Sequence, residues 1–133
     1  MFGRAPAVHP SSMTSFRTAT DLISEAKARI TEVSASEVQE MQDRGDPVVY
    51  LDVREQNEWN LGHLPRATFI PRGILESNIE QRVPRDSRVV VYCASGNRSA
   101  LAADTLKQMG YAHVSSMAGG IRAWVDLGGV VEG

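Results

Sequence analysis

Hydrophobic positions along this chain fall into short unbroken runs, separated by segments in which apolar residues recur at helical spacing. The two strongest runs are 47–53 and 88–92. Runs this short and this apolar are typical of strands buried on both faces of a sheet. Residues 68–70 and 113–117 form weaker runs of the same kind. The pattern therefore predicts four strands.

Helices are predicted between these strands from apolar spacing and from capping residues. The first is capped by Thr20 or Asp21 and runs to about Ile30. A capping box at 34–37 opens a second helix, which stops at Gly45. Further helical segments are expected at three places: 74–81, 99–109 and 121–127.

Strands that alternate with helices predict an α/β domain with a central, mainly parallel sheet. The chain has 133 residues, which is the size of one domain and enough to bury a core. In open parallel sheets, ligands bind beyond the carboxyl ends of the strands. Cys93 directly follows the run at 88–92, so we expect it at such an end.

Composition narrows the class of partner. Lys and Arg number 14 against 16 Asp and Glu, for a net charge of −2, so nothing favours nucleic acid or a membrane surface. No apolar run approaches the roughly 18 residues of a membrane span. The three histidines (His9, His63 and His113) lie far apart in the sequence, so we expect no metal site.

A single cysteine excludes a disulfide within the chain and favours a reducing compartment, which predicts a cytoplasmic protein. Residues 1–20 are rich in Ser, Thr, Pro and Ala, and carry Arg4 and Arg17 but no acidic residue. We expect a flexible N-terminal tail there. A transit peptide has the same composition and stays open as the alternative.

Cys93 opens a six-residue segment that ends at Arg98 and joins a predicted strand to a predicted helix. Gly96 permits the positive φ of a tight turn, and successive N–H groups of such a turn can form an anion nest. The N-terminus of the following helix adds a positive partial charge. We therefore expect a thiolate with a lowered pKa beside a site for a second anion. A cysteine that only fills the core is the alternative, but it would gain nothing from this loop.

Three segments resemble the signatures of the rhodanese family, in the family's order. Residues 93–99 (Cys-Ala-Ser-Gly-Asn-Arg-Ser) resemble its active-site loop. Residues 52–55, followed by Glu58-Trp59 and Gly62-His63-Leu64-Pro65, resemble its first signature, and residues 119–124 resemble its C-terminal one. The family more often has Phe or Tyr at the position of Trp59 and Gly at that of Arg66, which leaves the rim of the site and the substrate open.

The resemblance implies a three-layer α/β/α domain over residues 21–133, with an added N-terminal helix. In that family the cysteine attacks the outer sulfur of a donor such as thiosulfate and becomes a persulfide, without any metal or organic cofactor. Carried over, Cys93 is the catalytic residue. The substrate-binding loop is then formed by six residues: Ala94, Ser95, Gly96, Asn97, Arg98 and Ser99.

The acceptor of the sulfur is expected to be external, because the chain has no second cysteine that could resolve a persulfide as a disulfide. Cyanide, glutathione or a reduced thioredoxin-like protein would serve. Arg98 could face the bound anion or anchor the loop, and we favour anchoring because the backbone nest already supplies donors. Ser99 is expected to cap the helix, with its hydroxyl within reach of the loop.

Other charged residues are predicted to support the site. Asp52 and Arg54 end a buried strand, so their charges need partners, and Glu58 is the candidate partner of Arg54. Arg66 and Arg72 are candidates for adding positive charge at the rim.

Two other functions compete with sulfur transfer. A cysteine phosphatase or arsenate reductase also has a Cys-to-Arg loop, but five residues separate Cys from Arg in the phosphatases, whereas four do here. The smaller ring favours a sulfur atom over a tetrahedral phosphate. A non-catalytic binding module, or a sulfur carrier that works only with a dedicated partner, stays open.

Overall fold

The computed structural model of the chain describes residues 15–133. It contains a five-stranded sheet in which every pair of neighbouring strands is parallel, in the order β1-β5-β4-β2-β3. The strands are β1 (Thr31–Val33), β2 (Val48–Asp52), β3 (Ala67–Phe69), β4 (Arg88–Tyr92) and β5 (His113–Met117). The helices are α2 (Ala19–Arg29), α3 (Ala35–Arg44), α4 (Gln56–Leu61), the short 3-10 turn η1 (Arg72–Ile74), α5 (Leu75–Arg82), α6 (Asn97–Gln108) and α7 (Gly120–Asp126).

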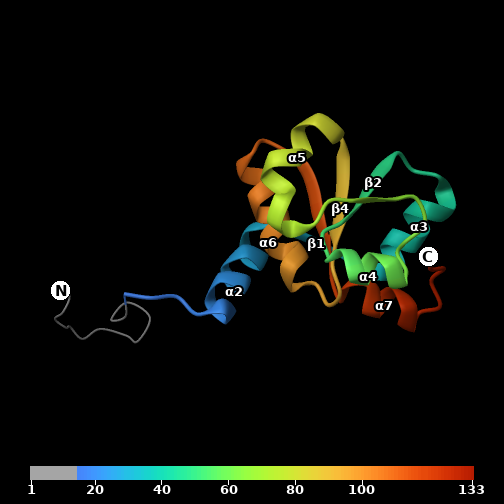
Figure 1. Cartoon of the computed structure of the whole chain (residues 1–133), viewed down its shortest axis with the longest axis horizontal. Coiled ribbons are helices and arrows are strands. Elements are labelled where there is room, and N and C mark those ends of the chain that lie inside the picture. The colour runs from blue at the N-terminus through green and yellow to red at the C-terminus, as the bar shows by residue number, and fades with distance from the viewer. Residues whose placement is uncertain (1–14) are drawn as a thin grey trace.

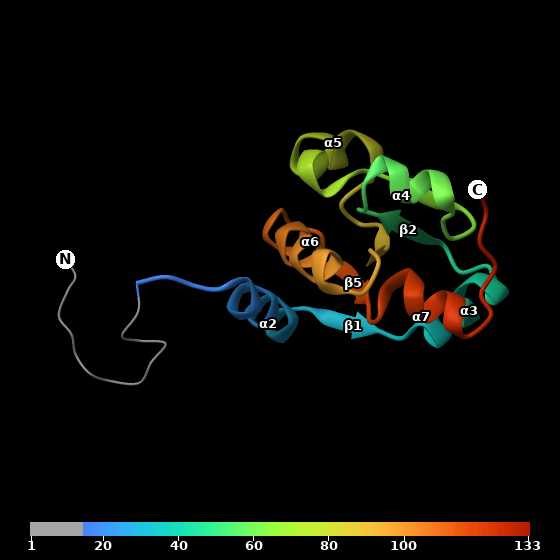
Figure 2. The same cartoon turned by 60° about the horizontal axis from the view of Figure 1, so that its bottom comes forward.

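Helices cover both faces of the sheet, which confirms the three-layer α/β/α architecture (Figures 1 and 2). Alternate side chains of the central strands point to opposite faces. Leu51 and Val91 belong to a core cluster that α5 and α6 complete, whereas Tyr50 and Val90 belong to one completed by α3 and α7. The central runs are apolar without alternation because both faces are covered.

Four strands lie within one residue of the predicted ranges at each end, but β1 was not predicted. It has three residues at the edge of the sheet, too few to produce a periodic signal. The six-residue helix α4 was not predicted either. The capping box at Ser34 and the left-handed stop at Gly45 were predicted correctly for α3.

The start of the first helix was predicted two or three residues too late, because the expected cap was Thr20 or Asp21. Helix α2 begins at Ala19, and its cap is Thr18, whose hydroxyl accepts the Asp21 N–H at 3.0 Å while the Asp21 carboxylate accepts the Thr18 N–H at 3.0 Å. A boundary between residues 20 and 21 therefore falls inside the first turn of a helix. A flexible tail was predicted over residues 1–20. Residues 1–14 of it lie outside the described part of the chain.

The strand order places the candidate site. After β2 the chain moves outward to β3, and after β4 it moves the other way to β5, so the two central strands flank a topological switch point. Asp52 pairs with Tyr92 in register, and the Val53 N–H donates to the Tyr92 carbonyl at 3.2 Å. Cys93 therefore emerges beside Val53 and Arg54. In residues 15–133 no helix is long and apolar enough to cross a membrane.

Helix α2 packs against α6 through a small side chain and an ion pair. Ala26 is 0% exposed, and Arg29 donates two hydrogen bonds to Asp104, from Nε at 2.9 Å and Nη2 at 2.7 Å. We expect Ala26→Leu to overpack this contact and to lower the free energy of unfolding by about 1–3 kcal/mol. Ala28→Leu, at an exposed position of the same helix, is the matched control. Urea unfolding measures both, and equal stabilities would contradict the close contact.

Candidate active site

The loop between β4 and α6 holds the sulfur of Cys93 at its centre. Cys93 is 1% exposed, and its Sγ accepts the Gly96 N–H at 3.2 Å and the Ser99 N–H at 3.3 Å. Gly96 has a φ of +102°, a conformation that glycine adopts without strain. It is also the N-cap of α6, so the helix begins at Asn97, two residues earlier than predicted. Ser99 therefore lies in the first turn and is not the cap.

These contacts decide the charge of the thiol. Burial raises the pKa of Cys93, but hydrogen bonds from the Ser99 hydroxyl and from the N–H groups of Ser99, Gly96 and Ser95 lower it by more. The net result is a pKa below the ordinary value for cysteine. The Ser99 hydroxyl lies 3.5 Å from Sγ, so it can donate to the thiolate.

The start of α7 fixes the orientation of this loop. The N–H of Ile121 donates to the Cys93 carbonyl at 2.8 Å, and that of Arg122 to the Ala94 carbonyl at 3.1 Å. In a trans peptide the C=O and the following N–H point in opposite directions. Holding these two carbonyls on α7 therefore turns the N–H groups of Ala94 and Ser95 away from α7, which is the arrangement an anion nest requires.

The buried carboxylate at the end of β2 is neutralised locally. Arg54 donates to Asp52 from Nε at 3.0 Å and from Nη2 at 2.7 Å, and Nη2 also donates to the Gly62 carbonyl at 2.7 Å. Both side chains are buried. The sequence-based assignment of Glu58 to Arg54 was wrong, because Asp52 lies on the same strand end and reaches the guanidinium first.

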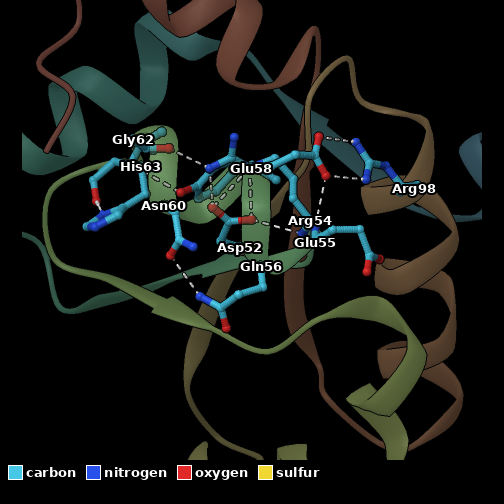
Figure 3. Close-up of polar contacts among 11 residues, drawn as sticks. Asp52, Arg54, Glu55, Gln56, Glu58, Asn60, Gly62, His63 and Arg98 are labelled. Atoms are coloured by element: carbon cyan, nitrogen blue, oxygen red, sulfur yellow. Dashed lines mark hydrogen bonds and ion pairs between the residues drawn. The ribbon is translucent and has the colours of Figure 1, made fainter. Parts of the chain in front are cut away.

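Glu58 instead pairs with Arg98, forty positions away in the sequence (Figure 3). The two N–H···O distances are 2.8 and 2.9 Å, a bidentate geometry. The Arg98 guanidinium lowers the pKa of the Glu58 carboxyl from 4.5 to about 2. This pair joins α4 to the first turn of α6, so the contacts of Arg98 are those of an anchor. The exposed Ser95 and Asn97 lie on the outer side of the loop.

Of the two candidate rim arginines, Arg66 does not lie beside Cys93. It immediately precedes β3 and donates to the Gln42 carbonyl at 3.3 Å, so it belongs to the opposite, amino edge of the sheet. It has a φ of +64°, a left-handed conformation that residues other than glycine rarely adopt. Its assignment to the rim was therefore wrong. Arg72 lies at the carboxyl edge, where its N–H donates to the Val53 carbonyl at 3.1 Å, and its side chain donates to Glu76 and Thr105. Its place at the rim stays a prediction.

Ser116 lies in the site but was not predicted from the sequence. Ser116 of β5 is 0% exposed, and its Oγ lies 2.7 Å from Oγ of Ser99. Ser99 thus contacts both Cys93 and a second buried hydroxyl. The sequence did contain a signal for it, because Ser116 is a polar residue inside a predicted strand. Among the described residues, no group of three His, Cys, Asp or Glu side chains converges as a metal site would require.

A groove of about 370 Å³ opens beside the loop. Its wall includes Ala94, the residue after the cysteine, and side chains from α4, α7 and the C-terminal segment. This volume is in the range of small-molecule sites.

Residues 34–127 match the family described as "Rhodanese-like domain". The match covers most of the chain, including the loop at 93–99 and both flanking signatures. The chain belongs to the rhodanese-like domain family.

Relatives of this rhodanese-like domain carry names that refer to sulfur. A sulfurtransferase from Allochromatium vinosum is 36% identical over 83 residues, which cover 62% of this chain and 77% of the relative. The putative sulfur carrier protein YrkF of Bacillus subtilis is 33% identical over 76% of this chain and 54% of its own length. The probable adenylyltransferase/sulfurtransferase MoeZ of Mycobacterium tuberculosis is 32% identical over 73% of this chain. The chain spans only 25% of that relative and about half of the Bacillus one.

A solved structure from Rhodopseudomonas palustris is similar over nearly the whole domain. The TM-score is 0.82 at 34% identity, and the match covers 90% of this chain and 97% of that one. That protein is described as being of unknown function and as a possible tyrosine phosphatase.

Removing the Ser99 hydroxyl should raise the pKa of Cys93 in the rhodanese-like domain. In Ser99→Ala the thiolate loses a donor while its burial is unchanged, so the midpoint of alkylation rate against pH should move upward. Ser95→Ala is the matched control, because Ser95 contributes through its backbone N–H, which the substitution keeps. Identical midpoints in wild type and Ser99→Ala would contradict a role for the hydroxyl.

The Glu58–Arg98 pair should contribute a pH-dependent part of the stability. Because the folded pKa of Glu58 is depressed, its contribution is complete above about pH 4.5 and is lost as the pH falls through about 2. Glu58→Gln should lower the free energy of unfolding by about 1 kcal/mol at pH 7, since the pair is partly exposed. The difference from wild type should shrink on acidification. Glu32→Gln, at an exposed carboxylate of β1, is the control and should show no such trend.

Proposed function

We propose that this rhodanese-like domain is a sulfurtransferase that carries sulfane sulfur as a persulfide on Cys93. The observation that supports it most directly is the position of Sγ, which accepts the N–H groups of Gly96 and Ser99 at 3.2 and 3.3 Å. Donors already directed at the sulfur favour the anionic nucleophile and would also favour an anion formed on it.

The proposed first step uses thiosulfate as donor. The Cys93 thiolate attacks the outer sulfur, the S–S bond of thiosulfate breaks, and sulfite leaves with the bonding electrons. In the second step an acceptor thiolate attacks the outer sulfur of the persulfide, and the Cys93 thiolate is the leaving group. No proton transfer is required in either step when both nucleophiles are anions.

The surroundings of Cys93 agree with a route that uses no histidine base. His63 stacks on Trp59 with ring centroids 3.6 Å apart, and one of its ring nitrogens bonds to the Leu64 carbonyl. His113 begins β5 at the amino edge, the far end of the sheet from Cys93. Among residues 15–133, neither histidine hydrogen-bonds to the cysteine.

The acceptor in this proposal is cyanide or an external thiol, either a small molecule or a thioredoxin-like protein, in a reducing compartment such as the cytoplasm. Cys93 is the only cysteine of the chain, so a disulfide cannot form within it to release the sulfur. A sulfur carrier that delivers to one dedicated protein is the narrower form of the same proposal, since a relative is named a putative sulfur carrier.

A cysteine phosphatase is the second candidate, because a solved structure with a TM-score of 0.82 is described as a possible tyrosine phosphatase. Two features speak against it. Four residues separate Cys93 from Arg98, and both terminal nitrogens of Arg98 are occupied by Glu58. The guanidinium would have to leave Glu58 before it could hold a phosphate.

We predict that incubation with thiosulfate adds the mass of one sulfur atom to the intact protein and that cyanide or a thiol removes it. Cys93→Ser should gain no mass, because it lacks the nucleophile. Mass spectrometry of the intact protein measures both steps. An unchanged wild-type mass with every sulfane donor, together with turnover of an aryl phosphate, would reject sulfur transfer in favour of the phosphatase.

A further inference from the structure

We propose that the groove beside Ala94 is the binding site for the sulfur acceptor, and that Arg122 selects low-molecular-weight thiols that carry a carboxylate. This inference rests on the proposed sulfurtransferase function and deepens it. It concerns which thiols are good acceptors, not whether the persulfide forms.

The groove is placed and shaped for a small organic molecule. It begins at the loop residue Ala94 and is about 370 Å³ in volume. Three aliphatic side chains in its wall remain exposed to solvent: Leu61 at 87%, Val125 at 54% and Val131 at 41%. A ligand with a short hydrocarbon chain would remove part of this apolar surface from water.

Arg122 differs from every other arginine in residues 15–133. Each of the others has its guanidinium in an ion pair or hydrogen bond with the protein, whereas the exposed Arg122 side chain has neither with any described residue. Its own N–H donates to the Ala94 carbonyl at 3.1 Å, so its Cα lies next to the catalytic loop. Arg122 also lines the groove, so its unpartnered guanidinium is available to a ligand there.

Arg122 is the cation available to a ligand near the loop, because the charges of Arg54 and Glu58 in the groove wall are already paired. Arg54 is balanced by Asp52, and Glu58 by Arg98. Asp126 also lines the groove, but it lies one helical turn, about 6 Å, farther along α7 from the loop. Arg122 therefore starts nearer the loop than Asp126, and the exposed aliphatic residues form the apolar part of the wall.

This distribution fits a thiol whose carboxylate lies a few bonds from its sulfur. The acceptor thiolate must reach the outer sulfur of the Cys93 persulfide, and Ala94, the residue next to Cys93, is the part of the loop that lines the groove. A carboxylate close to that thiolate would meet Arg122, whose planar donors match it bidentately. The transfer itself forms the acceptor S–S bond and breaks the bond to Cys93 Sγ, which leaves as the thiolate.

The test compares two acceptors on protein that has first been loaded with thiosulfate and freed of excess donor. 3-Mercaptopropionate carries the carboxylate, and 2-mercaptoethanol does not. In Arg122→Gln the rate constant for 3-mercaptopropionate should fall about two- to fivefold, as expected for an exposed ion pair, while that for 2-mercaptoethanol stays unchanged. Arg122→Lys should keep most of the preference. The preference of the wild type should weaken as salt is raised.

Lys27→Gln is the matched control, since it removes the same charge from α2, outside the groove. The expected result is a wild-type ratio of the two rate constants. Equal losses in Lys27→Gln and Arg122→Gln would overturn the inference in favour of a general effect of net charge. Equal losses for both thiols in Arg122→Gln would overturn it in favour of a structural role. Failure to load sulfur at all would instead reject the proposed function, so the two failures are distinguishable.

Discussion

The close approach of Gly120 to the backbone of Cys93 and Ala94 is the constraint on which the site depends. Gly120 has a φ of +59°, and a Cβ there would lie 2.5 Å from the Cys93 and Ala94 carbonyl oxygens. Only glycine lets α7 begin so near the loop. The two N–H groups that follow then hold the loop carbonyls, and the geometry of the peptide bond turns the next N–H groups the other way. The charge of the sulfur is thus set partly by a glycine 27 positions later in the sequence.

The Ser99 hydroxyl and the N–H groups of the loop control the charge of the sulfur, because the charged side chains around it are paired with one another. Asp52 is buried, and Arg54 supplies the opposite charge together with hydrogen bonds that compensate for its lost hydration. Arg98 is held by Glu58. This second pair also ties α4 to α6 across the switch point between β2 and β4. The same ion pairs therefore stabilise the carboxyl edge of the sheet and leave the loop N–H groups available to an anion.

The segments around the sulfur and those that depart from the expected pattern lie in different places. The loop, the Gly119–Gly120 pair and the buried Trp124 all lie within residues 34–127, the part of the chain that matches the rhodanese-like domain. Arg66 takes a left-handed backbone conformation, and Trp59 forms an aromatic stack with His63 and Phe69. Neither side chain hydrogen-bonds to Cys93. Under the proposed function, the acceptor would be selected at the groove, where Arg122 and the exposed aliphatic residues lie.

The sequence by itself determined the elements and the chemistry that depend on neighbours along the chain. Strands β2 and β4 follow from continuous apolar runs, α3 from its caps, and the loop from Gly96 between a strand and a helix. Short elements such as β1 and α4 left no periodic signal. Only the tertiary structure decided which charged side chains form pairs. Strand order and register bring Glu58 to Arg98, so that Arg54 pairs with Asp52 instead. They also put Arg66 at the edge of the sheet away from Cys93. Spacing along the chain predicts contacts between residues on neighbouring turns of one helix. The ion pair between Glu58 and Arg98 instead joins two segments that come together only when the sheet assembles.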